Sequence, residues 1–373
     1  MDRLPVMLVA FYLPQFHPIP ENDLWWGKGF TDWTNTRRAR RQFKGHYQPQ
    51  LPTELGFYDL RDPEVLERQA ELARRYGIHG FCFHYYWFGG RRVLERPLDD
   101  FLARGRPDIP FCCSWANENW TRRWDGLESE VLLRQEYGGD WEERFIRDLL
   151  PVLSDDRYIR VDGAALLLVY RVDQVPDARR VAEVWRDIAL REGGIELHLA
   201  AVQSFGIEDP RPYGLDAAVE FPPHPFRGGR PQPKVRRLRR GFRGTLEEYE
   251  AVVRDMLAKP LLPDYRWYRG LMPSWDNTAR RGLDAYIAVD SSPAAYRHWL
   301  AELSAQALSK ADTQAPLVFV NAWNEWAEGT HLEPDDRYGR AWLEATAAGL
   351  ADGLRTFPAG EHHPRVAEAS GSL

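Results

Sequence analysis

The segment PLVFVNAWNEWAEGTH, residues 316–331, opens with an apolar run and continues into polar and aromatic residues. A short and continuous apolar run like the one that opens it predicts a strand buried on both faces, as in a parallel sheet covered by helices. Polar and aromatic residues follow at once, from Asn321 to His331. We therefore expect a strand over residues 316–323 that delivers this polar segment at its carboxyl end.

The same kind of apolar run occurs seven more times along the chain. These predicted strands are residues 6–12, 79–87, 110–115, 165–170, 197–203, 217–221 and 268–273. Helical patterns separate them, at residues 62–76, 93–103, 140–150, 178–191, 245–257, 293–309 and 338–350, with only a weak signal after residue 203. Thr245 and Glu248 have capping-box spacing and predict that one helix begins there.

Repeated strand–helix units predict an α/β protein, specifically a (β/α)8 TIM barrel with elaborated βα loops. No glycine-rich GxGxxG turn follows the first strand, which disfavours a dinucleotide-binding fold. We expect a single barrel domain over residues 1–357 and a flexible tail over residues 358–373.

Composition excludes several classes of function. The net charge of −6 disfavours a protein that binds nucleic acid through phosphate contacts. The three cysteines show no metal-ligand spacing, so we expect no metal and no cofactor. The sequence has no apolar run long enough for a membrane span and no evident signal-peptide cleavage site, from which we expect a cytoplasmic protein.

Tryptophan is unusually abundant, with 15 in 373 residues. Ten of them fall at the predicted carboxyl ends of strands: Trp25, Trp26, Trp33, Trp87, Trp115, Trp120, Trp124, Trp275, Trp323 and Trp326. In a TIM barrel the chemistry gathers at that face. Aromatic plates interleaved with Asn, Asp and Glu suit a carbohydrate, because apolar sugar faces stack on rings while hydroxyls take directed hydrogen bonds. This pattern predicts the wall of a sugar-binding cleft.

Cleavage of a glycosidic bond needs two carboxyl groups, one to protonate the leaving oxygen and one to assist at the sugar. Glu325 and Glu328 directly follow the last strand and are the candidate catalytic pair. Glu118 lies after another predicted strand and Glu220 at the end of one, and both could instead form salt bridges or cap helices. His84 could be structural or contact substrate, Asp32 could be a turn residue or bind hydroxyls, and residues 333–336 could simply cap the last helix.

We expect carbohydrate to be contacted by side chains that gather at the same barrel face. These are Tyr12, Trp26, Asp32, Trp33, His84, Tyr86, Trp87, Trp115, Asn117, Glu118, Trp120, Glu220, Trp275, Asn277, Asn324, Trp326 and His331.

Five segments together resemble a known family: AFYLPQFHP from Ala10, WGKGFTDWTN from Trp26, GFCFHYYWF from Gly80, WANENW from Trp115 and NEWAEGTHLEP from Asn324. They are similar to the WbsX-type family, which is labelled glycosyltransferase-like and associated with polysaccharide and O-antigen synthesis. The resemblance extends over residues 5–350. The segment beginning at Asn324 is also similar to glycoside hydrolase family 99, the endo-acting α-mannosidases and α-mannanases, which are (β/α)8 barrels.

Carried onto this chain, the resemblance to family 99 implies roles for two residues. Glu325 would deprotonate the sugar 2-hydroxyl, which attacks the anomeric carbon to give a 1,2-anhydro intermediate. Glu328 would protonate the leaving group and then activate water, so that configuration is retained. Ala327 stands where that family typically has histidine, and the resemblance therefore leaves the mannose preference open.

Several alternatives remain at this level. Glu118 and Glu325 could act directly as acid/base and nucleophile, and the chain could be a glycosyltransferase or transglycosidase, or a glycan-binding protein without catalysis. The segment 225–244 is rich in Arg, Lys, Gly and Pro. It could be a mobile insertion, a lid or a site for an anionic ligand.

Overall fold

The computed structural model describes residues 6–122, 127–224, 230, 232–259, 263–311 and 315–356 of the chain. Trp124, the start of the segment 225–244 and the tail from Pro358 lie outside the described residues.

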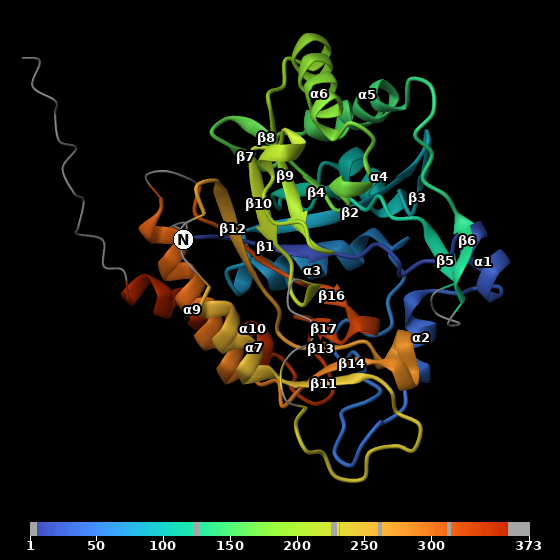
Figure 1. Ribbon diagram of the computed structural model, residues 1–373, viewed down its shortest axis with the longest axis vertical. Coiled ribbons are helices and arrows are strands. Elements are labelled where there is room, and N and C mark those ends of the chain that lie inside the picture. The colour runs from blue at the N-terminus through green and yellow to red at the C-terminus, as the bar shows by residue number, and fades with distance from the viewer. Residues whose placement is uncertain are drawn as a thin grey trace, which may run out of the picture.

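Eight parallel strands form the centre of the molecule (Figure 1). In chain order they are β1 (Met7–Tyr12), β2 (Gly80–Phe88), β4 (Phe111–Trp115), β8 (Ala164–Val169), β9 (Leu197–Gln203), β10 (Ala217–Glu220), β12 (Arg266–Leu271) and β15 (Leu317–Val320). Each strand pairs with the next in that order, from β1 and β2 onward. The last strand, β15, pairs with β1, so that the sheet closes on itself. The predicted TIM barrel is confirmed, and every predicted strand corresponds to one barrel strand.

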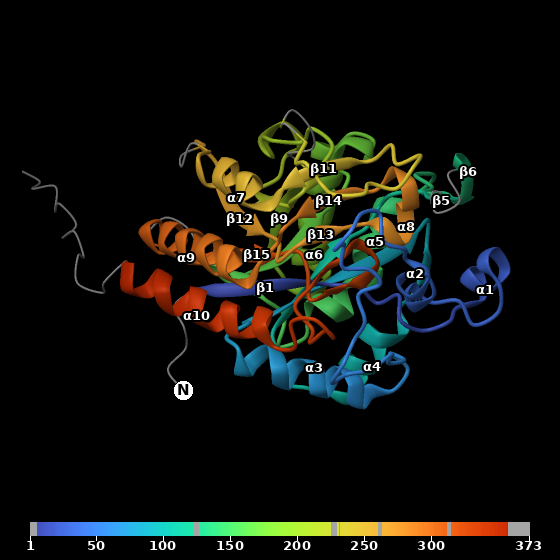
Figure 2. The same cartoon turned by 90° about the horizontal axis from the view of Figure 1, so that it is seen from below.

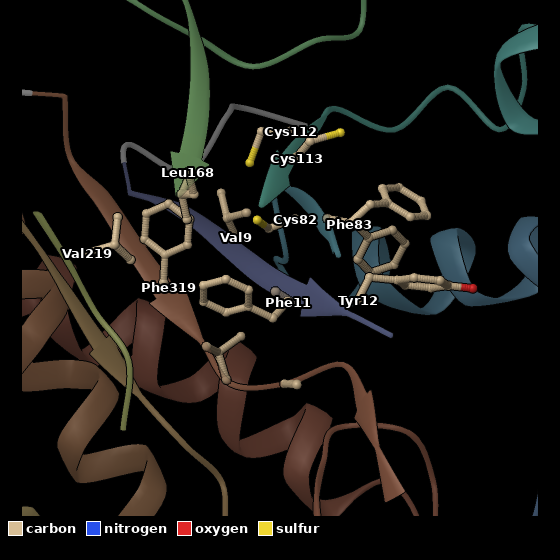
Figure 3. Close-up of a cluster of buried hydrophobic side chains, with 14 of the residues drawn as sticks. Val9, Phe11, Tyr12, Cys82, Phe83, Cys112, Cys113, Leu168, Val219 and Phe319 are labelled. Carbon is tan, nitrogen blue, oxygen red and sulfur yellow. The ribbon is translucent and has the colours of Figure 1, made fainter. Parts of the chain in front are cut away.

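The strands are buried on both faces, which explains their continuous apolar sequences. Alternate side chains point into the barrel or out toward the helices. Figure 3 shows this for β1, where Phe11 and Tyr12 point to opposite sides of the strand. Phe11 packs on Phe319 of β15, with ring centroids 5.7 Å apart, whereas the Tyr12 hydroxyl donates to Gln69 Oε1 outside the barrel.

Helices cover the outside of the barrel, as Figure 2 shows for α3, α9 and α10. The long ones are α3 (Pro63–Arg75), α4 (Arg96–Arg104), α5 (Trp141–Leu153), α6 (Ala178–Gly193), α7 (Tyr249–Leu257), α9 (Pro293–Ser309) and α10 (Ala341–Thr356). Asp62 caps α3 by accepting from the Glu64 amide. None of the described helices is both long enough and apolar enough to cross a membrane.

One predicted helix start is wrong. Thr245–Glu248 forms strand β11, which pairs in parallel with β14 (Tyr286–Val289), and helix α7 begins only at Tyr249. The pairing with β14 and the burial of Glu247 against the Tyr286 hydroxyl outweigh the local capping signal.

Short elements elaborate the carboxyl ends of the barrel strands. They are the helices α1 (Pro20–Trp26), α2 (Asp32–Arg38) and α8 (Thr278–Arg281), the 3-10 turns η2 (Val172–Gln174), η3 (Arg211–Tyr213), η5 (Gly282–Asp284) and η6 (Trp326–Glu328), and the strands β3 (Arg91–Val93), β5 (Trp120–Arg122), β6 (Leu127–Leu133), β13 (Trp275–Asp276), β16 (Asn324–Glu325) and β17 (Thr330–His331). A further short strand, β7 (Arg160–Val161), pairs with β8. The segment after β9 holds only the turn η3, in keeping with its weak helical signal.

Candidate active site

Arg280 lies at the centre of a cluster of three carboxylates. Its Nη2 atom is 3.0 Å from Asp32 Oδ2 and 3.0 Å from Glu325 Oε2, and its Nη1 atom is 2.9 Å from Glu328 Oε1. Asp32 comes from α2, Arg280 from α8, and the two glutamates from β16 and η6 after barrel strand β15. The predicted catalytic pair is thus held by one guanidinium, whose planar fork suits carboxylate oxygens.

The loop geometry that brings Glu328 to Arg280 depends on Gly329. This residue has a left-handed backbone, with φ of +59°, and a Cβ atom built there would lie 2.8 Å from the Asp276 carbonyl oxygen. Only glycine allows so close an approach between the η6 loop and β13. Asp276 in turn accepts from the Thr278 amide at the start of α8, and Asn277 Oδ1 accepts from the Tyr286 amide, so that both residues fix the helix carrying Arg280.

The three carboxylates differ in their access to solvent. The exposed fraction of the side chain is 0% for Asp32, 8% for Glu325 and 24% for Glu328. Burial raises the pKa of Glu325 well above its ordinary value; Arg280 opposes this shift, and the charges of Glu328 and Asp32 add to it. A buried carboxylate with a raised pKa is a stronger base, while the more open Glu328 can meet a leaving group and water.

Two residues of β2 extend the site. Burial, with a smaller contribution from Arg280, lowers the pKa of His84 to about 4, so that its imidazole is neutral at pH 7. Burial and then the negative charge of Glu325 raise the pKa of Tyr86, whose hydroxyl accepts from Gln15 Nε2 at 3.3 Å. His84 Nδ1 and Asp32 Oδ1 are buried and have no hydrogen-bond partner among the described residues. A bound ligand could satisfy these two atoms.

The segment that carries the glutamates is held by a buried carboxylate, Glu333. Its oxygens accept from Trp326 Nε1 at 2.6 Å, Gln69 Nε2 at 2.6 Å and the Tyr58 hydroxyl at 2.9 Å. Asn324 is fixed separately, by hydrogen bonds with both the amide and the carbonyl of Leu13. Trp326 and Asn324 flank Glu325 in the sequence, and they act as supports rather than as exposed sugar contacts.

An aromatic group borders the site beyond Tyr86. The Trp120 ring packs edge-on against Tyr86, with centroids 5.3 Å apart, and also contacts Trp25 at 5.9 Å and Phe88 at 5.8 Å. Trp26 lies at the end of α1 and contacts Phe30 at 5.8 Å. Trp25, Trp26 and Trp120 are all half-buried, so part of each surface is open to a ligand.

Other predicted contacts are core residues, and for them the expectation of a cleft wall is wrong. Trp87, Trp115 and Trp275 have no exposed surface. Trp115 packs on Phe145 with centroids 4.5 Å apart, and the Trp87 indole donates to Asp148 of α5. Tyr12 faces α3 as described above. When both faces of a strand are apolar, the sequence does not separate inward from outward side chains.

Glu220 is also structural. It is fully buried and pairs with Arg269 Nε at 2.9 Å and Lys259 Nζ at 2.8 Å. Arg269 donates to the Met256 carbonyl of α7 and to Gln306 of α9, so the pair lies between the barrel and its helices. Glu220 therefore points away from the Arg280 cluster.

The WANENW segment makes its own contacts. Glu118 pairs with Arg171 at 2.9 Å, and buried Asn117 bonds to the amide and carbonyl of Arg171. These contacts join the loop after β4 to the loop after β8.

Trp33 and His331 both pack on Trp326, which supports the segment that carries the two glutamates. The Trp33 ring lies 5.5 Å from Trp326, and its Nε1 donates to the Tyr58 carbonyl. His331 stacks on Trp326 at 3.7 Å and pairs with Asp335. A cavity of about 300 Å³ is lined by Trp275 and His331 but by neither glutamate, so it is separate from the Arg280 cluster.

Arg280 is the functional residue that sequence reasoning missed. Its partners lie 248 and 45 residues away in the chain, and α8 is a four-residue helix inside a long insertion, so no local pattern singles it out. The sequence indicates Glu333 only as a candidate cap of the last helix.

Comparison with known proteins places the chain in a family. A model of the family described as "Glycosyltransferase WbsX" matches residues 8–346. The chain belongs to the WbsX family. Two curated relatives, both described as uncharacterized protein WxcX and both from Xanthomonas campestris pv. campestris, strains B100 and ATCC 33913, are 47% identical over 349 residues. The match covers 94% of this chain and 50% of each relative, so the chain spans about half the length of these WbsX relatives.

Solved structures show where else this fold occurs. A glycoside hydrolase family 99 endo-α-mannosidase from Bacteroides thetaiotaomicron aligns with a TM-score of 0.55 and 14% identity, over 94% of this chain and 97% of that one. A protein described as glycoside hydrolase-like aligns with a TM-score of 0.58 and 14% identity, over 92% and 94% of the two chains. At this level of identity the likeness concerns the barrel fold alone, and it agrees with the expected resemblance to family 99.

Proposed function

We propose that the chain is a retaining glycoside hydrolase that cleaves within a polysaccharide or complex glycan, with Glu325 and Glu328 as its catalytic carboxyl groups. The observation that carries the proposal is the Arg280 cluster, which gathers both glutamates and Asp32 at the carboxyl end of a barrel strand. That is the face at which TIM-barrel enzymes place their chemistry.

The environments of the two glutamates support different roles. Glu325 is the more buried and has the raised pKa, and it acts as the base that removes the proton of the sugar 2-hydroxyl. The resulting oxygen attacks the anomeric carbon as the bond to the leaving oxygen breaks, while Glu328 donates a proton to that oxygen. Water then opens the 1,2-anhydro ring, giving its proton to Glu328, and Glu325 returns its proton to the 2-oxygen.

The remaining groups bind and orient. Asp32 Oδ1 and His84 Nδ1 have no hydrogen-bond partner among the described residues, and they bind sugar hydroxyls. Arg280 holds both catalytic carboxylates in place before substrate arrives. Glu118 is a poorer candidate for a direct pair with Glu325, because Arg171 holds it between the loops after β4 and β8, whereas Arg280 gathers Glu325 with Glu328 and Asp32.

Substitution of the pair tests this proposal. Glu325→Gln and Glu328→Gln should each lower turnover on a panel of polysaccharides by about 10²–10⁴-fold while leaving the melting temperature unchanged. The matched control is Glu118→Gln, which removes a carboxylate at another strand end and should keep activity. Near wild-type turnover in both single variants would contradict the assignment.

Glycosyl transfer is the second candidate, and the description of the WbsX family as glycosyltransferases favours it. A transferase with the same glutamates would pass the sugar to a hydroxyl of another glycan instead of to water. Mass spectrometry of the products separates the two functions, because transfer yields lengthened chains and hydrolysis only shortened ones.

A further inference from the structure

Two loops of the molecule carry a concentration of positive charge that the proposed chemistry does not use. We call residues 37–44 and 232–244 the basic loops. Together they hold eleven exposed cations and no Asp or Glu: Arg37, Arg38, Arg40, Arg41, Lys44, Lys234, Arg236, Arg237, Arg239, Arg240 and Arg243. The chain as a whole has a net charge of −6, so the charge of this surface is opposite in sign to that of the whole chain.

The basic loops lie against each other although they are about 200 residues apart in sequence. The Lys44 amide donates to the Arg236 carbonyl at 2.9 Å, and the Arg239 amide donates to the Gln42 carbonyl at 2.7 Å. In Figure 1 they extend together beyond β11 and β14, at the end of the molecule opposite α5 and α6. The loops' own apolar residues, Phe43, Val235 and Phe242, pack on the small apolar cluster around Leu246.

Few carboxylates neutralise these cations. Among the described residues, only Arg243 of the eleven has a carboxylate within ion-pair distance, Asp284 at 2.7 Å. Elsewhere on the surface many arginines are paired, such as Arg147 with Glu143 and Glu192. Unpaired arginines in such number repel one another, and an external anionic partner would relieve that repulsion.

Leu238 indicates which kind of anionic partner fits. It lies in the run Arg236-Arg237-Leu238-Arg239-Arg240 and is 44% exposed, one of the few large apolar side chains that are. A convex loop with an apolar residue between arginines matches the headgroup region of a bilayer, where cations meet phosphates and the apolar side chain enters the acyl boundary. A soluble polyanion would give Leu238 no favourable environment.

We propose that the basic loops form a binding surface for an anionic phospholipid membrane. The surface adjoins the carboxylate cluster, since the first loop continues α2, which carries Asp32, and the second is bonded to Leu283, three residues beyond Arg280. Membrane attachment here therefore brings the catalytic carboxylates close to the lipid surface. This binding does not depend on the proposed hydrolysis.

Vesicle co-sedimentation of the 373-residue chain tests the surface directly. The chain should bind vesicles of phosphatidylcholine mixed with phosphatidylglycerol, and binding should weaken at high salt, because added ions screen exposed charges. Vesicles of phosphatidylcholine alone should bind poorly. Replacing Arg236, Arg237, Arg239 and Arg240 with serine should weaken binding by about 10²-fold or more, and Leu238→Ser by about tenfold.

The matched control removes the same charge elsewhere. Arg68, Arg75, Arg179 and Arg254 are exposed arginines on α3, α6 and α7, and replacing these four with serine should leave vesicle binding intact. Melting temperatures of both quadruple variants check that the fold survives. Wild-type binding by the loop variant, equal loss in the control variant, or binding to soluble polyphosphate but to no vesicle would each overturn the proposal.

Discussion

Glu220 ends barrel strand β10 and Glu325 follows barrel strand β15, and each pairs with an arginine, yet they have different tasks. Glu220 lies in the layer between the barrel and helices α7 and α9, and its two oxygens are engaged by Arg269, Lys259 and the Gly270 amide. Glu325 shares Arg280 with Glu328 and Asp32, and one oxygen of Asp32 has no partner among the described residues. A carboxylate with every oxygen satisfied stabilises the fold, whereas a cluster with more carboxylates than cations can take up protons and ligands.

The largest expected effect separates Glu220 from Glu328, a carboxylate of the Arg280 cluster. Glu220→Gln should lower the free energy of unfolding by about 3–5 kcal/mol, because it removes the negative charge that pairs with the buried Arg269 and with the partly buried Lys259. The folded fraction should keep its turnover. Glu328→Gln should do the reverse, abolishing turnover with little change in stability. Chemical denaturation and rate measurements on both variants decide this, and a common phenotype would remove the distinction.

Arg280 should set the pH dependence of turnover, because it acts on the pKa of Glu325. Its positive charge lowers the pKa of Glu325, against the larger effect of burial. Arg280→Gln should therefore raise that pKa further, so that the base is ionised only at higher pH. The acid limb of the kcat/KM profile should move upward by about one to three pH units. Arg280→Lys keeps the charge and should move it less, and an unshifted limb in Arg280→Gln would show that Glu325 is not the base.

Glu333 predicts a pH dependence of stability rather than of rate. Burial raises its pKa to about 7, above the value of about 4.3 expected in the unfolded chain. The unfolded state releases this proton first, so the contribution of Glu333 to stability should fall as pH rises from about 4.5 to about 7, by up to about 3 kcal/mol. The difference in unfolding free energy between wild type and Glu333→Gln isolates the effect. A difference that stays constant across this range would contradict it.

The smallest expected effect compares two tryptophans. Trp120 is half-buried next to Tyr86, and Trp120→Ala should weaken glycan binding by about 1–3 kcal/mol, by analogy with the loss of stacking on nucleic-acid bases. Trp275 is fully buried, so Trp275→Ala should cost stability through the cavity it leaves. Calorimetric titration with a glycan that the wild type binds, together with thermal melts, distinguishes the two variants. Equal affinity in wild type and Trp120→Ala would place Trp120 in the core group.

The sequence predicts most of the barrel because each strand is a continuous apolar run, whereas apolar residues in the helices recur with the helical period of about 3.6 residues. The same property hides side-chain direction, which is why Tyr12, Trp87 and Trp115 were assigned to the wrong side. Glu325 and Glu328 were predictable because they follow a strand end. Arg280 was not, since its contacts with Asp32 and Glu325 arise only when α8 folds over distant segments.

One measurement tests most directly whether this site hydrolyses glycosidic bonds. Wild type and Glu328→Gln are incubated with the polysaccharide panel in oxygen-18 water, and the products are analysed by mass spectrometry. We expect shortened chains with one heavy oxygen at each new reducing end from wild type, and none from Glu328→Gln. Unlabelled or lengthened products from wild type, or equal labelling by the variant, would contradict hydrolysis by this pair.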